Sequence, residues 1–342
     1  MRFVNDYSEL AHPEVLRALS RPGVEPLGNY GLDAHSIRAA SLIRDRIGRP
    51  DAEVRFCAGG TQANLLVLTA ALRPHEAVIA CGSGHIATHE TGAIEATGHK
   101  VYTVDGDDGK LTPEAIGAAA SYHSDEHMVK PRLAYLSHST ENGTIYSRSE
   151  LEAIREACDR FGLYLYVDGA RLGSALNAGS ADVGYRELGA LADAFYIGGT
   201  KNGALFGEAI VLCAEPLRRD FRYIIKQRGA MLAKGAAIGL QFEALFEDGL
   251  YDRIARSANA TAARLAEGIR GQGYRFRYAV QSNQIFPILR AGVARELGAK
   301  YGFHTWEELG EDCAVRLVTS WATDEAAVDE FLTDLRAAGG AA

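Results

Sequence analysis

Between residues 62 and 213, short apolar runs alternate with longer segments of helical period. The runs are rich in β-branched or aromatic residues, and we expect strands at Ala77–Ala80, Lys100–Val104, Arg132–Ser137, Leu163–Val167, Ala194–Gly198 and Glu208–Cys213. The segments Gln62–Arg73 and Ser149–Phe161 repeat apolar residues every three or four positions. Ser149, with Glu152 three residues later, predicts a capping box. This alternation predicts an α/β fold with a mostly parallel sheet covered by helices, which binds ligands at the carboxyl ends of its strands.

After about Ala214 the pattern changes. A long, largely helical stretch (219–273) is followed by strand-like runs at 274–280, 283–289 and 314–321. This pattern predicts a smaller C-terminal α/β domain, with an antiparallel sheet backed by helices. We therefore expect three parts: an N-terminal segment (1–35) that packs on the large domain, the large domain (36–245), and the small C-terminal domain (246–342).

The composition narrows the possible partners. The chain has 36 basic and 44 acidic residues, a net charge of -8, and no basic block, so nucleic acid is not expected as a partner. Its apolar runs are shorter than the ~20 residues that span a bilayer, and its first residues lack the apolar core of a signal peptide, so we expect no membrane partner. The five cysteines are odd in number and form no CxxC pair, which predicts a reduced, cytoplasmic protein without a metal site.

A lysine and an aspartate follow two of the expected strands. Asp168 ends an apolar run, and Lys201 follows the next run, "AFYI", through a glycine pair. An acid and an amine on one rim suit pyridoxal 5'-phosphate (PLP), because the lysine can hold its aldehyde as a Schiff base and the carboxylate can keep its pyridine nitrogen protonated. Glycines around Lys201 let the backbone approach a cofactor and turn sharply. Taken alone, Asp168-Gly169 also fits an ordinary turn.

Two further segments suit the same cofactor. Gly59, Gly60 and Thr61 begin an apolar helical segment, where backbone N–H groups and the helix dipole favour an anion such as a phosphate group. His85 follows a strand and a Gly-Ser-Gly turn, with Glu90 five residues later. Each segment alone fits a plain turn or a structural histidine, and their combination favours a PLP site.

The order of five short motifs resembles the threonine aldolase family, a member of the β-eliminating lyase group of fold-type I PLP enzymes. The motifs are YGLD (30–33), GGTQAN (59–64), HIATHE (85–90), VDGARLG (167–173) and GGTKNGALFGEA (198–209), and the similarity covers essentially the whole chain. The resemblance implies an aldehyde-lyase that cleaves a β-hydroxy-α-amino acid, such as threonine or allo-threonine, to glycine and an aldehyde. It also implies a homodimer or homotetramer with shared active sites.

The resemblance implies roles for single residues at the centre of the site. Lys201 would bind PLP, Asp168 would pair with its pyridine nitrogen, and His85 would stack on its ring near the side chain of the substrate. Arg171 and Arg316 would bind the substrate carboxylate, a task that suits the planar fork of arginine.

Other matches concern the phosphate group of PLP. Gly60 and Thr61 match the phosphate cradle of the family. Lys226 and Lys234 are similar to basic residues that reach the phosphate from a neighbouring subunit.

The remaining matches and departures lie around the substrate. Tyr30 matches a position near the active site, and Glu90 matches an acid close to the stacking histidine. Asn5 stands where the family usually has a serine, and it would contact the substrate carboxylate. Better-known aldolases carry a histidine linked to the choice of diastereomer in the loop that here spans Leu136–Ser147. His138 is nearby but does not match it, so no role is transferred to this residue.

Three alternatives remain open from the sequence. The same cofactor also supports β-elimination, transamination or racemisation at Cα. An NAD-binding oxidoreductase would share the α/β pattern, but no glycine fingerprint follows a first strand. A cofactor-binding regulator without catalysis is the third alternative, although the chain has no recognisable DNA-binding appendage.

Overall fold

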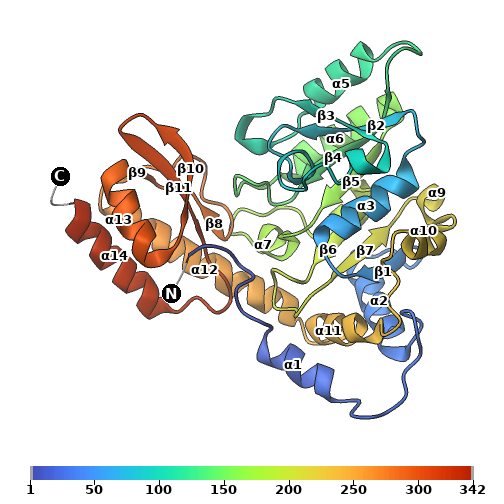
Figure 1. The fold of residues 1–342 in the computed structure, drawn as a ribbon, viewed down its shortest axis with the longest axis horizontal. Coiled ribbons are helices and arrows are strands. Elements are labelled where there is room, and N and C mark those ends of the chain that lie inside the picture. The colour runs from blue at the N-terminus through green and yellow to red at the C-terminus, as the bar shows by residue number, and fades with distance from the viewer. Residues whose placement is uncertain (1–2, 340–342) are drawn as a thin grey trace.

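The computed structural model describes residues 3–339. Figure 1 shows two bodies: a large sheet with its helices, and a smaller sheet backed by α13 and α14, with the long helix α12 running between them. The expected α/β architecture is therefore confirmed. The expected domain limits at residues 35 and 245 remain predictions. Residues 1–2 of the expected N-terminal segment and residues 340–342 of the expected C-terminal domain lie outside the described chain.

The large sheet has seven strands in the order β1-β7-β6-β5-β4-β2-β3. They are β1 (Glu53–Cys57), β2 (Glu76–Cys81), β3 (Lys100–Val104), β4 (Lys130–Ser137), β5 (Tyr164–Asp168), β6 (Ala194–Gly198) and β7 (Glu208–Leu212). β7 runs antiparallel to both of its neighbours, whereas β2 to β6 pair in parallel. All six expected strands are present, and β1 is an addition.

Helices cover both faces of this sheet. One face carries α2 (Ala34–Ile47), α5 (Pro113–Tyr122), α6 (Arg148–Phe161), α8 (Tyr185–Leu191) and α11 (Ala236–Glu247), and the other carries α3 (Gly60–Ala71), α9 (Glu215–Arg218) and α10 (Phe221–Gln227). The strands alternate between the two resulting cores. On β5, Leu165 and Val167 pack on the first face, whereas Tyr166 packs on the second.

The N-cap of helix α6 lies two residues before the N-cap that the sequence predicted. Its N-cap is Ser147, whose side chain accepts from the N–H of Glu150, while the Glu150 carboxylate accepts from the N–H of Ser147. The expected capping box at Ser149 and Glu152 is therefore wrong. Ser149 already lies inside the helix, and Glu152 instead pairs with Arg148 at 2.8 Å.

The small domain is built on a central strand, β11 (Asp312–Val318). It pairs antiparallel with β8 (Gln284–Ile285), β9 (Ile288–Arg290) and β10 (His304–Leu309), and α12 (Leu250–Gly271), α13 (Ala291–Tyr301) and α14 (Glu325–Gly339) pack beside it. The expected strand at 274–280 is wrong, because this segment makes only an isolated bridge, Phe276 to Pro287. The helix-backed antiparallel sheet agrees with the expectation.

The N-terminal segment contacts both domains. Phe3 is buried against Tyr301 and Phe331 of the small domain, and the N–H of His12 donates to the carbonyl of Gly203 at 2.8 Å in the large domain. Helix α1 (Pro13–Ser20) packs beside α11. The residues before α1 therefore pass between the two domains.

The other helical turns are α4 (His85–Thr88), α7 (Leu172–Leu176), η1 (Glu95–Thr97) and η2 (Asp107–Gly109). Across residues 3–339, none of the helices has the length and apolar character required to cross a membrane.

Candidate active site

The acid and the amine lie at the ends of adjacent strands. Asp168 is the last residue of β5, and Lys201 follows the end of the neighbouring parallel strand β6. The buried carboxylate of Asp168 accepts from the N–H of Ala170 at 3.0 Å, from the hydroxyl of Tyr135 at 2.7 Å and from the amide of Asn64 at 3.2 Å. Three donors therefore hold this carboxylate in place.

The amine of Lys201 has no hydrogen bond or ion pair with the described residues; its nearest ring contact is Tyr7, at 5.8 Å from Nζ. Burial and then the charge of Arg171 lower the pKa of Lys201 from its usual range, against the opposing charges of Asp6, Glu141 and Asp168. A lowered pKa increases the neutral fraction of the amine, which is the form that attacks a carbonyl carbon.

The turn before Lys201 is tightly held. Glu208 on β7 accepts from the N–H of Gly199 at 2.9 Å and from the hydroxyl of Thr200 at 2.8 Å. A Cβ at Gly199 would lie 2.6 Å from the carbonyl oxygen of Gly207, so only glycine fits there without displacement. The glycines thus allow two backbones to approach closely beside Lys201.

His85 is the first residue of α4, and its Nδ1 lies 2.8 Å from the Glu90 carboxylate. Because a carboxylate accepts, Nδ1 donates and Nε2 is left without this partner. Burial lowers the pKa of His85, but the hydrogen bond with Glu90, together with the charges of Asp168 and Glu141, raises the pKa overall.

An anion cradle lies at the start of α3. Gly59 is the N-cap and has no side chain to bind the first N–H groups of the helix, which lack partners within it. A Cβ at Gly60 would lie 2.9 Å from the hydroxyl of Tyr196, so the space beside this helix end depends on glycine. Together with the half-buried Thr61, these groups fit a phosphate.

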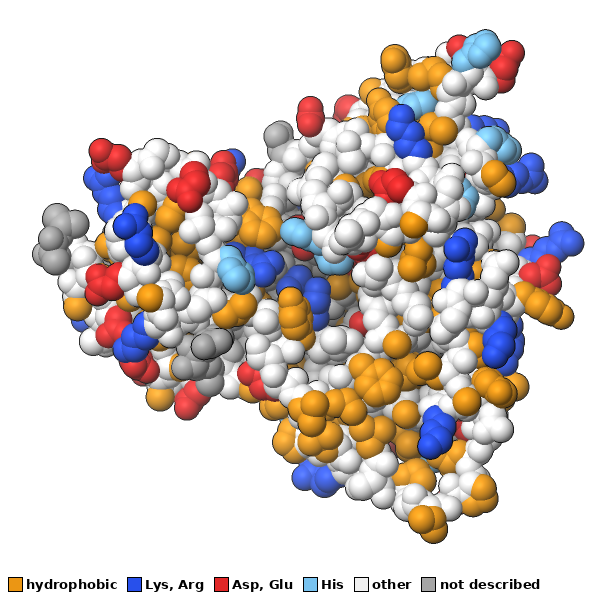
Figure 2. All heavy atoms as spheres, in the orientation of Figure 1, with side chains coloured by type: hydrophobic (Ala, Val, Ile, Leu, Met, Phe, Trp, Pro, Cys, Tyr) orange, Lys and Arg blue, Asp and Glu red, His pale blue; other side chains and the backbone are white. Residues whose placement is uncertain are grey.

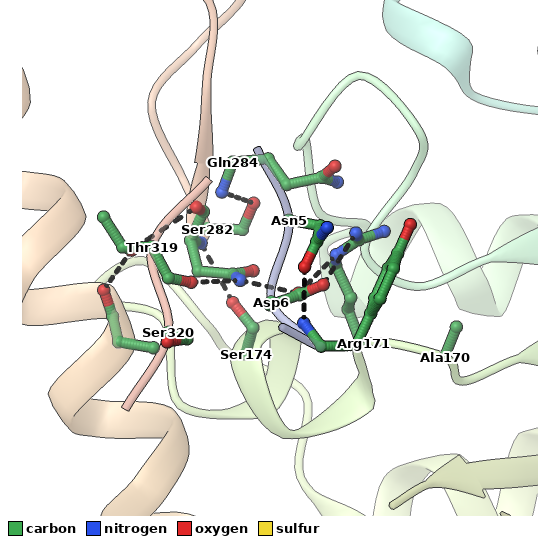
Figure 3. Close-up of polar contacts among 12 residues, drawn as sticks. Asn5, Asp6, Ala170, Arg171, Ser174, Ser282, Gln284, Thr319 and Ser320 are labelled. Carbon is green, nitrogen blue, oxygen red and sulfur yellow. Dashed lines mark hydrogen bonds and ion pairs between the residues drawn. The ribbon is translucent and has the colours of Figure 1, made fainter. Parts of the chain in front are cut away.

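Arg171 is already paired with a protein carboxylate. Its Nε and Nη2 donate to the two oxygens of Asp6, at 2.8 and 3.1 Å, and both side chains are buried (Figure 3). Asn283 also donates to Asp6, at 2.9 Å. Burial raises the pKa of Asp6, but Arg171 and Lys201 lower it overall. The fork of Arg171 is therefore engaged inside the protein.

Arg316, on β11, has no carboxylate partner among the described residues. Its Nη2 reaches the carbonyl of Val4 at 3.4 Å, and its Nε is buried without an acceptor. Burial and the charge of Arg171 lower the pKa of Arg316 from its usual value. An unpaired, partly buried guanidinium is suited to a ligand carboxylate. Figure 2 shows a hollow between the two domains, with Lys, Arg and His side chains in it.

Other expected site residues are occupied differently or lie elsewhere. Asn5 uses its side-chain oxygen to accept from Tyr7 and Ser8 within its own turn. Lys226 lies on α10, with Nζ 5.5 Å from the ring of Tyr30, and Tyr30 lines a cavity of about 380 Å³. In the described chain, no hydrogen bond or ion pair links Lys226, Lys234 or Tyr30 to Lys201 or Asp168.

Sequence reasoning missed several buried polar residues at this site. Asn64 lies inside the GGTQAN motif, and Tyr135 lies two residues before the end of β4, so both had a positional signal. Asp6 follows Asn5 in the N-terminal motif, but nothing in the sequence indicated its pairing with Arg171, which is 165 residues away. Glu141, in the loop after β4, is buried, and its charge acts on Lys201, Arg171 and Arg316.

Comparison with known proteins gives one consistent result. A model of the beta-eliminating lyase family matches residues 26–291. Low specificity L-threonine aldolases from a Pseudomonas species and from Pseudomonas aeruginosa are 33% and 34% identical to the chain, covering 98% and 99% of it and 97% and 98% of their own lengths. The solved structure of a Leishmania major threonine aldolase superposes with a TM-score of 0.96, at 46% identity over 98% of both chains.

Proposed function

The chain belongs to the beta-eliminating lyase family, and on this premise we propose that it is a PLP-dependent carbon–carbon lyase. It cleaves a β-hydroxy-α-amino acid, threonine or allo-threonine, to glycine and an aldehyde. The names of its relatives, which are called threonine aldolases, indicate the same reaction. One observation carries this proposal. The amine of Lys201, which has no partner in the described chain, and the carboxylate of Asp168, which accepts three hydrogen bonds, lie at adjacent strand ends.

The described residues fit the cofactor. Bound PLP supplies an aldehyde that condenses with amines and a ring that accepts the electron pair of a bond broken at Cα. Lys201 offers the amine, and Asp168 would hold a proton at the pyridine nitrogen. Gly60 and Thr61 would bind the phosphate at the start of α3, where a Cβ would fill the space. His85 would lie against the ring.

The substrate carboxylate is assigned to Arg316 first. Its guanidinium lacks a carboxylate partner in the described chain, whereas the fork of Arg171 is held by Asp6. Arg171 would contribute through its remaining nitrogen and its charge, and Asn5 through its amide. This arrangement fixes the substrate by its carboxylate, so that the orientation of the Cα–Cβ bond is set before it breaks.

The proton of the β-hydroxyl group requires an acceptor. Nε2 of His85 is the ring nitrogen that Glu90 leaves free, and it would exchange this proton directly or through a water molecule. The raised pKa of His85 shifts its ring toward the protonated form, so a higher pH favours its action as a base.

The decisive experiment supplies threonine and allo-threonine to the purified, PLP-loaded protein. We expect glycine and acetaldehyde in equal amounts, and no product from Lys201→Ala. Borohydride reduction followed by peptide mapping should place the cofactor on Lys201. An oxo acid, a racemised amino acid or ammonia instead of glycine would favour the transaminase, racemase or β-elimination alternatives.

We also propose that the active site is shared between subunits of a homodimer or homotetramer. Lys226, Lys234 and Tyr30 would then reach the phosphate of a neighbouring subunit. Support comes from Tyr30, a non-glycine residue with φ of 59°, a conformation usually retained where function requires it. Leu32 and Ile37, whose side chains are exposed, line the same cavity as Tyr30, and Figure 2 shows an apolar patch over α1, α2 and α11.

A cytoplasmic location is likewise a proposal. It is supported by the five cysteines, which are all buried free thiols.

A further inference from the structure

Asn64 is a fully buried polar residue on the apolar side of α3. Its neighbours Ala63, Leu66 and Val67 belong to the core between this helix and the sheet. An uncompensated amide in such a core is costly, so its partners indicate what it does.

The side chain of Asn64 joins two buried carboxylates. Nδ2 donates to Oε1 of Glu90 at 2.6 Å and to Oδ2 of Asp168 at 3.2 Å. Oδ1 accepts from the hydroxyl of Tyr166 at 2.8 Å. A flipped amide would turn an oxygen toward both carboxylates, so Tyr166 and the two acids together fix one orientation.

In each of these carboxylates, the oxygen that accepts from Asn64 also contacts a second side chain. Oε1 of Glu90, which accepts from Asn64, also contacts Nδ1 of His85 at 2.8 Å. Oδ2 of Asp168, which accepts from Asn64, also accepts from Tyr135 at 2.7 Å. One neutral amide therefore separates the acid assigned to the pyridine nitrogen from the acid that orients the ring of His85.

We propose that Asn64 is a positioning residue that couples Asp168 to His85, so that the two sides of the cofactor site are fixed together. Its amide donates to both acids at once, and without it the two carboxylates would lose their shared donor in a low-dielectric interior. The inference rests on the proposed function only in taking PLP as the cofactor.

The test compares three variants. Asn64→Leu keeps the approximate shape and removes both donors. Tyr166→Phe keeps the volume of the core and releases the amide orientation. The control is Thr69→Val on the same helix, because the Thr69 hydroxyl donates only to the carbonyl of Leu65. The thermal midpoint of each variant reports on folding.

The first readout is the dissociation constant of PLP for cofactor-free protein. We expect binding about tenfold weaker for Asn64→Leu, a smaller loss in the same direction for Tyr166→Phe, and no change for Thr69→Val. The second readout is the NMR spectrum of ¹⁵N-labelled histidine in cofactor-free protein, recorded at a pH high enough to keep the ring of His85 neutral, because the pKa of His85 is raised. His85 should show one tautomer, protonated at Nδ1, in the wild type and averaged ring nitrogens in Asn64→Leu.

PLP affinity within twofold of the wild type in Asn64→Leu would overturn the proposal. A weaker affinity with an unchanged His85 spectrum would overturn the coupling. If Asn64→Leu does not fold, Tyr166→Phe decides by the same two readouts. Neither readout involves threonine cleavage, so a protein that binds PLP but lacks aldolase activity still gives a result.

Discussion

The charge of Arg171 acts on both Lys201 and Arg316, but the two arginines differ in their surroundings and therefore in their tasks. Arg171 is buried in an ion pair with Asp6, whereas Arg316 has no carboxylate partner in the described chain. Removing one member of a buried pair leaves an uncompensated charge, at a cost of about 3–5 kcal/mol. Removing a cation that has no ion-pair partner leaves no uncompensated charge behind.

We therefore predict a split between stability and substrate binding. Arg171→Ala should lower the free energy of unfolding by about 3–5 kcal/mol, as measured by urea denaturation. Arg316→Ala should leave it nearly unchanged and raise KM for threonine roughly 10- to 100-fold, because a charge-assisted hydrogen bond to the substrate is lost. Arg316→Lys should recover part of this affinity. A wild-type KM for Arg316→Ala would remove this residue from the substrate site.

The sequence predicted that Asp168 and Lys201 follow the ends of two expected strands, and in the structure these strands are neighbours. Asp168 and Lys201 could be predicted because a parallel sheet gathers the carboxyl ends of its strands at one edge, whatever the details of packing. The pair of Asp6 and Arg171 could not, since it depends on how the N-terminal segment passes between the domains. The partnerships of Asn64 could not be predicted either, because its position within a motif does not reveal what it bonds.

At the scale of elements, β6 and β7 are joined through the side chain of Glu208. This buried carboxylate on β7 holds the turn after β6, and burial raises the pKa of Glu208 to about 7. A pKa raised above the unfolded value of 4.5 means that folding favours the protonated acid. The contribution of Glu208 to the free energy of unfolding is therefore fully present below about pH 4.5 and is lost as the pH rises through about 7.

Glu208→Gln should remove this pH dependence. The variant should match the wild type near pH 5 and become more stable than it by about 3 kcal/mol near pH 8, since one pKa unit corresponds to about 1.4 kcal/mol. Urea denaturation across this range measures the difference, with the exposed Glu156→Gln as a control. A constant offset between Glu208→Gln and the wild type at every pH would contradict the prediction.

The start of α6 gives a second prediction at this scale. Ser147→Ala should lower the free energy of unfolding by about 1 kcal/mol, because Ser147 caps the helix through the N–H of Glu150. Ser149→Ala is the matched control and should have little effect, because Ser149 lies within the first turn. Equal losses for the two variants in thermal or urea unfolding would argue against the cap at Ser147.

The same elements show what the sequence could not reveal about the fold. The strands β3 and β6 were predicted residue for residue, because both are runs of β-branched or aromatic residues; β6 is buried inside the sheet, whereas β3 lies at its edge. The strands β1 and β10, also at sheet edges, were missed because their mixed sequences EVRFC and HTWEEL have a weak apolar pattern. The run at 274–280 has a strand-like sequence but no continuous partner.

At the scale of the whole molecule, two features have no functional role within a single chain. Lys226 and Tyr30 lie together on the large domain, without a hydrogen bond or ion pair to Lys201 in the described chain, and Tyr30 shares a cavity with an exposed apolar patch that includes Leu32 and Ile37. Both features are accounted for if a second copy covers this patch and receives Lys226 at its own cofactor. In a two-fold symmetric pair, each copy would then complete the site of the other.

Mixing two inactive variants tests this arrangement. Lys201→Ala and Lys226→Ala, unfolded together and refolded at equal amounts, should regain about a quarter of the wild-type activity. Half of the random pairs are hybrids, and each hybrid has one site with both lysines intact and one with neither. Each variant refolded alone is the control, and sedimentation should confirm that hybrids form. If Lys226 instead served its own chain, every site in the hybrid would lack one lysine, and the mixture would be no more active than its parts.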